Sequence, residues 1–130
     1  MQSPQISVLM TVYNRERFLR DAVISVLESG FTDFELIIVD DCSKDASALL
    51  AAELARKDSR IRFVRNEKNL GDYGNRAKAA AMARGRFLKY VDSDDMIYPH
   101  TLEVMYRAVS GFAHAGLALS HSQSEAERPY

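Results

Sequence analysis

Two short clusters of aspartates are the residues of this sequence best suited to bind a charged ligand. Asp40 and Asp41 follow the apolar run FELIIV, and Asp92, Asp94 and Asp95 follow the apolar run FLKYV. Carboxylates this close together repel one another unless a cation or hydrogen-bond donors neutralise them. They also supply the oxygen ligands that Mg²⁺ or Mn²⁺ prefers, and such an ion can stabilise a diphosphate as it leaves. The clusters therefore predict a divalent metal site that serves a diphosphate.

The segments around these clusters predict strands that alternate with helices. Apolar, β-rich runs indicate four strands at residues 6–13, 34–39, 61–65 and 87–91, and residues 115–119 are a candidate fifth. Helical spacing predicts helices after residue 14 and over residues 46–57, 75–84 and about 99–110. We expect Asn14 and Gly30 to cap the first helix, and Ser43 or Asp45 to cap the second. The fold class is α/β, a mainly parallel sheet with helices on both faces.

A parallel sheet brings the two clusters to one place. Ligands of open parallel sheets bind outside the carboxyl ends of the strands. Residues 11–14, 40–43 and 92–95, which follow three of the predicted strands, should therefore share one crevice.

Composition excludes several classes of function. The 130 residues are 47% hydrophobic and 27% charged, which is typical of one folded domain. The formal net charge of −1 makes nucleic acid an unexpected partner. No apolar run approaches the roughly 20 residues of a membrane span, and residues 1–5 do not resemble a signal peptide. The single cysteine, Cys42, excludes an internal disulfide and favours a cytoplasmic location.

Each candidate residue also has an interpretation without a ligand. An Asp-Asp pair after a strand is often a solvated turn, although three acids in four residues are rarely needed for one. Arg76 is open to interpretation as a surface residue of a helix, and Tyr13 as part of the core. The remaining candidate metal ligands show no metal-binding spacing among themselves and are interpreted as structural or surface residues: Cys42, His100, His114 and His121.

Four sequence blocks together resemble the family 2 glycosyltransferases. The blocks are SVLMTVYNRERFL, FELIIVDDCSKD, NLGDYGNRAKAAAMARGRF and YVDSDDMIYPHTL, in the order and approximate spacing of that family. The resemblance implies a GT-A fold, a Rossmann-like nucleotide-binding sandwich. It also implies transfer of a sugar from a nucleotide-sugar donor, commonly a UDP-sugar, to a hydroxyl of a glycan or other acceptor, with inversion at the anomeric carbon.

The resemblance also assigns roles in donor binding. Thr11, Val12 and Tyr13 match the segment that contacts the base through its backbone and an aromatic ring. Asp41 matches the aspartate that accepts a hydrogen bond from the uracil imide, with Asp40 beside it. Arg76 matches an arginine near the base.

The last acidic cluster matches the DXD motif, in which one carboxylate contacts ribose and another holds Mn²⁺ or Mg²⁺. Either Asp92 and Asp94 form the motif, or Asp94 and Asp95 carry the two roles. Our assignment gives nucleotide contacts to Asp92 and Asp94 and the metal to Asp94 with Asp95.

The general base of the family is expected beyond Tyr130, so no catalytic residue is named. Residues 1–120 are predicted to form the nucleotide-sugar-binding subdomain, and residues 121–130 a polar tail or the start of the acceptor-side half. The donor sugar, the acceptor and the oligomeric state are unspecified.

Two alternatives to the glycosyltransferase interpretation are a catalytically silent nucleotide-binding module and a receiver-type signalling domain. A receiver, however, places its acidic pair after the first strand, whereas here the pair follows the second.

Overall fold

Strands and helices alternate along the whole described part of the chain. The computed structural model describes residues 2–114 and 116. The strands are β1 (Ile6–Val12), β2 (Phe34–Asp40), β3 (Ile61–Arg65) and β4 (Phe87–Tyr90). The helices are α1 (Leu19–Leu27), α2 (Ser47–Lys57), α3 (Gly71–Met82) and α4 (Thr101–Ser110). The α/β class is confirmed. Apart from Gly116, the predicted fifth strand and the predicted tail lie outside the described residues.

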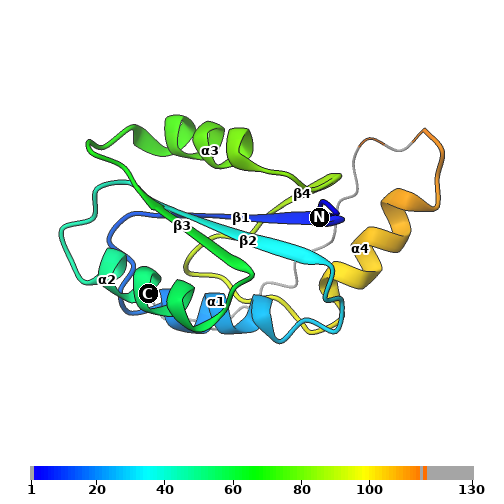
Figure 1. Ribbon diagram of the computed structural model, residues 1–130, viewed down its shortest axis with the longest axis horizontal. Coiled ribbons are helices and arrows are strands. Elements are labelled where there is room, and N and C mark those ends of the chain that lie inside the picture. The colour runs from blue at the N-terminus through cyan, green and yellow to red at the C-terminus, as the bar shows by residue number, and fades with distance from the viewer. Residues whose placement is uncertain (1, 115, 117–130) are drawn as a thin grey trace, which may run out of the picture.

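The four strands form one parallel sheet in the order β3-β2-β1-β4. Helices α1 and α2 cover one face and α3 covers the other (Figure 1). The chain therefore changes direction across the sheet at β1, because the connection through α3 leads to the opposite side of β1 from β2. In open α/β sheets such a switch point, here between β1 and β4, is where ligands bind.

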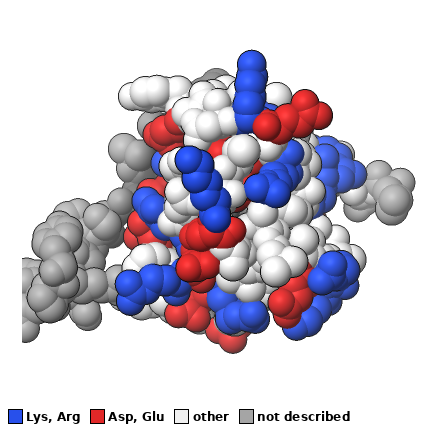
Figure 2. Space-filling view, turned by 90° about the vertical axis from the view of Figure 1, so that its left-hand side faces the viewer, with Lys and Arg blue, Asp and Glu red and all other residues white. Residues whose placement is uncertain are grey.

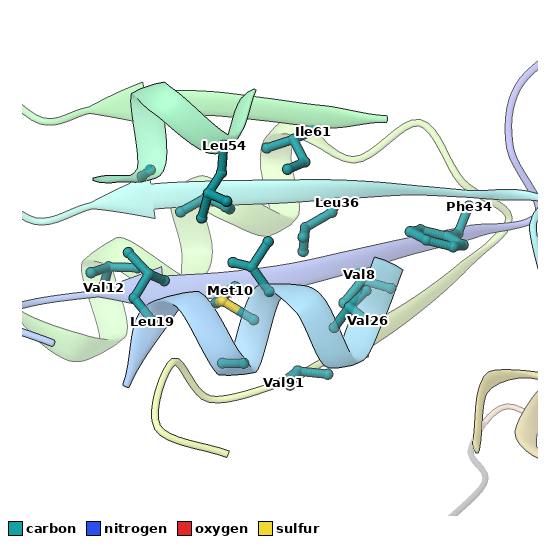
Figure 3. Close-up of a cluster of buried hydrophobic side chains, with 14 of the residues drawn as sticks. Val8, Met10, Val12, Leu19, Val26, Phe34, Leu36, Leu54, Ile61 and Val91 are labelled. Carbon is teal, nitrogen blue, oxygen red and sulfur yellow. The ribbon is translucent and has the colours of Figure 1, made fainter. Parts of the chain in front are cut away.

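Apolar side chains fill both faces of the two central strands. On one face, Val8, Met10 and Val12 of β1 lie towards Leu19 and Val26 of α1 (Figure 3). On the other face, the side chains of β1 and β2 pack against Ala79 of α3 in a smaller cluster. This burial explains why the run FELIIV is continuous rather than alternating. Among the described residues, none of the helices has both the length and the apolar character of a membrane span.

The predicted helix caps differ from those in the structure. Asn14 does not cap α1, which begins at Leu19 after a turn in which Arg15 accepts from the backbone N–H of Phe18 at 3.0 Å. Gly30 does not end α1 either, because the helix ends at Leu27 and Gly30 donates its N–H to the carbonyl of Pro99 at 2.9 Å. The N-cap of α2 is Ala46, which forms no side-chain cap hydrogen bond, so the cap predicted at Ser43 or Asp45 does not occupy that position. Asp45 Oδ1 instead accepts from the N–H of Ser47, the first residue of α2, at 2.9 Å.

A buried glutamate fixes the amino-terminal end of the sheet. Glu35 accepts hydrogen bonds from Ser7 Oγ at 2.7 Å, from the backbone of Arg84 at 2.8 Å and from Arg62 Nη1 at 2.9 Å. Burial alone would raise the pKa of Glu35, but these hydrogen bonds and the charge of Arg62 hold the pKa below its usual value. Gly85 is required beside this cluster, because a Cβ there would lie 2.5 Å from the backbone nitrogen of Ser7.

Candidate functional site

A cleft of about 530 Å³ opens at the carboxyl ends of the strands. Its walls come from the end of β1 and the residues after it, from the segments after β2 and β4, and from the first half of α3 with Asn69 just before it. The lining residues are Thr11, Val12, Tyr13, Arg15, Asp41, Asn69, Gly71, Asp72, Asn75, Arg76, Asp92, Ser93 and Asp94. Figure 2 views the molecule from this edge and shows acidic and basic side chains beside one another near the middle of the face. Charged groups of both signs therefore meet where the three predicted segments converge.

The backbone segments that surround the cleft are joined to one another by hydrogen bonds. The N–H of Asn14 donates to Ser43 Oγ at 2.9 Å, and Asn14 Oδ1 accepts from the N–H of Lys44 at 2.8 Å. The N–H of Arg15 donates to Ser47 Oγ at 2.8 Å, and Glu16 accepts from the N–H of Ala46 at 2.8 Å. Asn14 has a φ of 53°, a conformation that asparagine tolerates better than most residues. Its role is thus to hold two loops together rather than to cap a helix.

Asp41 is a buried carboxylate that holds the segment between β3 and α3. It is 3% exposed. Its Oδ1 accepts from the N–H of Leu70 at 2.7 Å and from Asn66 Nδ2 at 2.8 Å. Its Oδ2 accepts from the N–H of Gly71 at 3.0 Å. An ionised carboxylate has about four acceptor positions, so Oδ2 is the oxygen with capacity for a ligand.

Asp40 and Asp95, two of the predicted site residues, do not line the cleft among the residues that the structure describes. Asp40 is fully buried, and its Oδ2 accepts from the N–H of Ser43 at 3.0 Å and lies 3.6 Å from Arg65 Nε. Its Oδ1 has no hydrogen-bond partner within the described part of the chain. The N–H of Asp95 donates to the carbonyl of Asp92 at 3.0 Å in the turn after β4.

Arg76 joins two acidic walls of the cleft. Its Nη2 lies 2.8 Å from Asp92 Oδ1 and its Nε lies 3.0 Å from Asp72 Oδ1. Its guanidinium also lies over the ring of Tyr90, 5.5 Å from the centroid. The hydrogen bond to Asp92, and then that to Asp72, raises the pKa of Arg76 above its usual value, against the opposing effect of burial. Arg76 is therefore a charge partner of the predicted DXD region.

Arg15 is a second arginine of the cleft, and the sequence analysis did not identify it. Its Nε lies 3.3 Å from Asp94 Oδ2, and its Nη1 donates to the carbonyls of Tyr13 and Asn14 at 3.2 Å. The predicted neutralisation of the carboxylates is thus achieved in this structure by arginines and by N–H donors. The sequence signal for Arg15 was its place two residues after Tyr13, directly after residues 11–14, which were predicted to face the crevice.

The carboxylates suit a divalent cation only with help from a ligand. No group of three or more His, Cys, Asp or Glu side chains that could hold a metal ion occurs within residues 2–114 and 116. Asp94 is half-exposed, and its ion pair with Arg15 is long at 3.3 Å. Mg²⁺ is commonly bound by one or two carboxylates together with substrate phosphates. Asp94 therefore fits a metal only if a bound diphosphate and water would supply the remaining ligands.

Comparisons with known proteins agree on a single family. The family model described as Glycosyl transferase family 2 matches residues 7–125. An uncharacterized glycosyltransferase of Methanocaldococcus jannaschii, MJ1057, is 36% identical over 109 residues, which are 82% of this chain and 38% of that protein.

Solved structures share the fold. The crystal structure of Staphylococcus aureus TarS residues 1–349 in complex with UDP-GlcNAc superposes with a TM-score of 0.75 at 31% identity, over 82% of this chain and 31% of that one. A mannosyltransferase of Pyrobaculum calidifontis, solved with GDP-Man and Mn²⁺, has a TM-score of 0.71 at 19% identity, over 78% of this chain and 31% of that one, and shows the fold alone. The chain spans about a third of the length of these relatives. By its sequence blocks, its GT-A fold and the match over residues 7–125, this chain belongs to glycosyl transferase family 2.

Proposed function

We propose that the cleft binds the nucleotide of a UDP-sugar, and that the whole protein transfers that sugar to an acceptor hydroxyl with inversion. The observation that carries the proposal is the cleft itself. It brings Asp41, Arg76 and Asp94, predicted from three separate sequence blocks, to the carboxyl edge of one parallel sheet. The structure of TarS, which shares the fold at 31% identity, holds UDP-GlcNAc.

The uracil base would contact the end of β1 and Asp41. Tyr13 lines the cleft and is 44% exposed, so its ring is accessible for stacking. The uracil imide is a donor, and Asp41 Oδ2 accepts only one hydrogen bond from the described residues, the 3.0 Å bond from Gly71. Cytosine presents an acceptor at the same ring position, which a carboxylate repels. The site should therefore prefer UDP to CDP.

The diphosphate would need a cation in this cleft. Four carboxylates, those of Asp41, Asp72, Asp92 and Asp94, line it with two guanidinium groups, so the lining has two more negative than positive charges. A nucleoside diphosphate is itself an anion and is repelled by that excess. Mn²⁺ or Mg²⁺, held by Asp94 and by phosphate oxygens, would cancel that excess. When bound, the ion stabilises the charge of the departing diphosphate.

The acceptor side of the reaction is not assigned to any described residue. All the carboxylates of the cleft have roles in charge pairing or in holding the chain, and we name none of them as general base. A hydroxyl acceptor needs a base aligned with the anomeric carbon. We assign this base and the acceptor contacts to parts of the protein outside the described residues, and place the reaction in the cytoplasm.

Calorimetry of UDP binding with Mn²⁺ and with a chelator tests the proposal. We expect UDP to bind more tightly with Mn²⁺, and Asp94→Ala to remove that difference. Asp72→Ala is the matched control, because it removes one carboxylate from the same cleft but lies at the start of α3. Equal UDP affinity with metal and with chelator would contradict the metal assignment. Absence of UDP binding under both conditions would contradict the proposed function as a whole.

A further inference from the structure

A chain of buried amides leads from α3 to the carboxylate of Asp41. Asn66 and Asn75 are 4% and 2% exposed. Asn66 Nδ2 donates to Asp41 Oδ1 at 2.8 Å and to Asn75 Oδ1 at 2.9 Å. Asn66 Oδ1 accepts from Lys78 Nζ at 2.7 Å, and Asn75 Nδ2 donates to the carbonyl of Val39 at 3.0 Å. Every polar atom of the Asn66 side chain is therefore used.

The two ends of this chain fix the direction of every hydrogen bond in it. An ammonium group can only donate, so Lys78 Nζ requires the oxygen of Asn66 to face it. A carbonyl can only accept, so Val39 requires the nitrogen of Asn75 and thereby turns the oxygen of Asn75 towards Asn66. Both conditions direct Asn66 Nδ2, a donor, towards Asp41. The hydrogen bond from Lys78 is the main contact that prevents the Asn66 amide from flipping. Without Lys78, the flipped amide could present its oxygen to Asp41.

We propose that Asn66, held by Lys78, is a positioning residue that sets the selectivity of the cleft for uracil. The inference rests on the proposed function, in which Asp41 accepts from the base. Asn66 and the N–H of Leu70 occupy Oδ1 of Asp41, and this leaves Oδ2 as the oxygen that reads the ligand. Neither Asn66 nor Lys78 lines the cleft, so both residues affect base recognition indirectly, through the carboxylate of Asp41.

A neighbouring hollow provides a matched control. A depression of about 630 Å³ is lined by Asn66 together with Lys68 and Lys78. Each lysine contributes one positive charge to the same surface, but only Lys78 forms the described hydrogen bond to Asn66. Lys78→Met and Lys68→Met therefore remove equal charge, while only the first removes a donor that orients Asn66.

The test is calorimetry of UDP and CDP binding, at constant Mn²⁺, to the wild type and to Lys78→Met, Lys68→Met and Lys78→Arg. We expect Lys78→Met to weaken UDP binding by about threefold to tenfold, the effect of one hydrogen bond. CDP binding should not weaken in parallel, so the ratio of the two affinities should fall by the same factor. Lys68→Met should keep the wild-type ratio, and Lys78→Arg should restore it, since a guanidinium also donates to Asn66.

Asn66→Ala is the second test, and its fold is checked by circular dichroism before binding is measured. A folded Asn66→Ala variant should lose at least as much UDP preference as Lys78→Met; if it does not fold, Lys78→Met decides. A wild-type ratio in Lys78→Met, or an equal fall in Lys68→Met, would overturn the role of Asn66 while leaving the proposed function intact. A wild type that binds UDP and CDP equally would instead contradict base reading by Asp41, and the positioning role with it.

Discussion

Replacing Asp41 by asparagine should reverse the base preference of the cleft. Oδ1 of Asp41 faces two donors, Asn66 Nδ2 and the N–H of Leu70, so the amide oxygen of the new residue should take that position. The amide nitrogen then takes the position of Oδ2. There it presents a donor to the ligand, which suits the ring acceptor of cytosine and repels the imide of uracil.

The magnitude of each effect follows from the hydrogen bonds that change. UDP loses a bond to a charged acceptor, worth about 1.5 to 3 kcal/mol, so its affinity should fall by about tenfold to a hundredfold. CDP should gain affinity. The fold loses one acceptor, because the N–H of Gly71, now 3.0 Å from Oδ2, would face an amide nitrogen. An unsatisfied buried donor costs about 1 to 3 kcal/mol. For a domain of this size that corresponds to a fall in melting temperature of about 3 to 15 °C.

Calorimetry with UDP and CDP measures the first effect, and thermal melting followed by circular dichroism measures the second. Asp41→Ala is a less informative variant, because it removes three hydrogen bonds of 2.7, 2.8 and 3.0 Å and so mixes loss of binding with loss of fold. Retention of the wild-type UDP preference in a folded Asp41→Asn variant would refute the role of Asp41 in base recognition.

Three further predictions concern charge. Because its hydrogen bonds keep the pKa of Glu35 low, its share of stability is present above its usual pKa of 4.5 and is lost as pH falls through the lower folded value. In urea unfolding, Glu35→Gln should therefore have a lower free energy of unfolding than the wild type at pH 7, and this free energy should fall less in acid than that of the wild type. The same acid dependence in both proteins would contradict this. Arg76→Met should weaken UDP binding by about threefold to tenfold while changing the free energy of unfolding by under about 1 kcal/mol, since its ion pairs are partly exposed; tighter UDP binding in calorimetry would show that Arg76 competes with the nucleotide. Mn²⁺ alone should bind weakly by electron paramagnetic resonance and tightly once UDP is added; tight binding without nucleotide would indicate a complete protein site.

The fold was largely predictable from hydrophobic patterning. The third strand was predicted at its observed bounds, Ile61–Arg65, and the α2 prediction differed by one residue at its start. Helix α3 was predicted from Asn75 but begins at Gly71, because the segment 69–71 looked like an interruption of the pattern. In the folded chain the N–H groups of Leu70 and Gly71 bind Asp41, which lies 29 and 30 residues earlier. The contribution of such a distant side chain leaves no local signal; the local one is Asn69, whose Oδ1 also accepts from the N–H of Gly71 at 3.0 Å.

The same limit applies to the site. The convergence of strand ends follows from parallel topology, and it brought Asp41, Asp92 and Asp94 to one cleft as expected. Parallel topology did not predict which group each carboxylate contacts. Asp40 and Asp41 are adjacent in sequence, but alternation along an extended segment sends neighbouring side chains to different surroundings. Only Asp41 lines the cleft, and Asp40 is buried beside Ser43.

On one side of the cleft the hydrogen bonds are buried, and on the other side the ion pairs are partly exposed. This difference affects how a nucleotide-sugar donor would bind. Asp41 is buried, and its hydrogen bonds fix its orientation before any ligand arrives. The pairs of Arg15 with Asp94 and of Arg76 with Asp92 involve side chains that are 32% to 50% exposed, and such pairs contribute about 0 to 1 kcal/mol. They can therefore be exchanged at little cost. On the proposed function, if Asp94 held a cation, Arg15 would lose its ion-pair partner and its guanidinium would become available to the diphosphate. The cleft would then gain the charge of the cation and an unpaired guanidinium together.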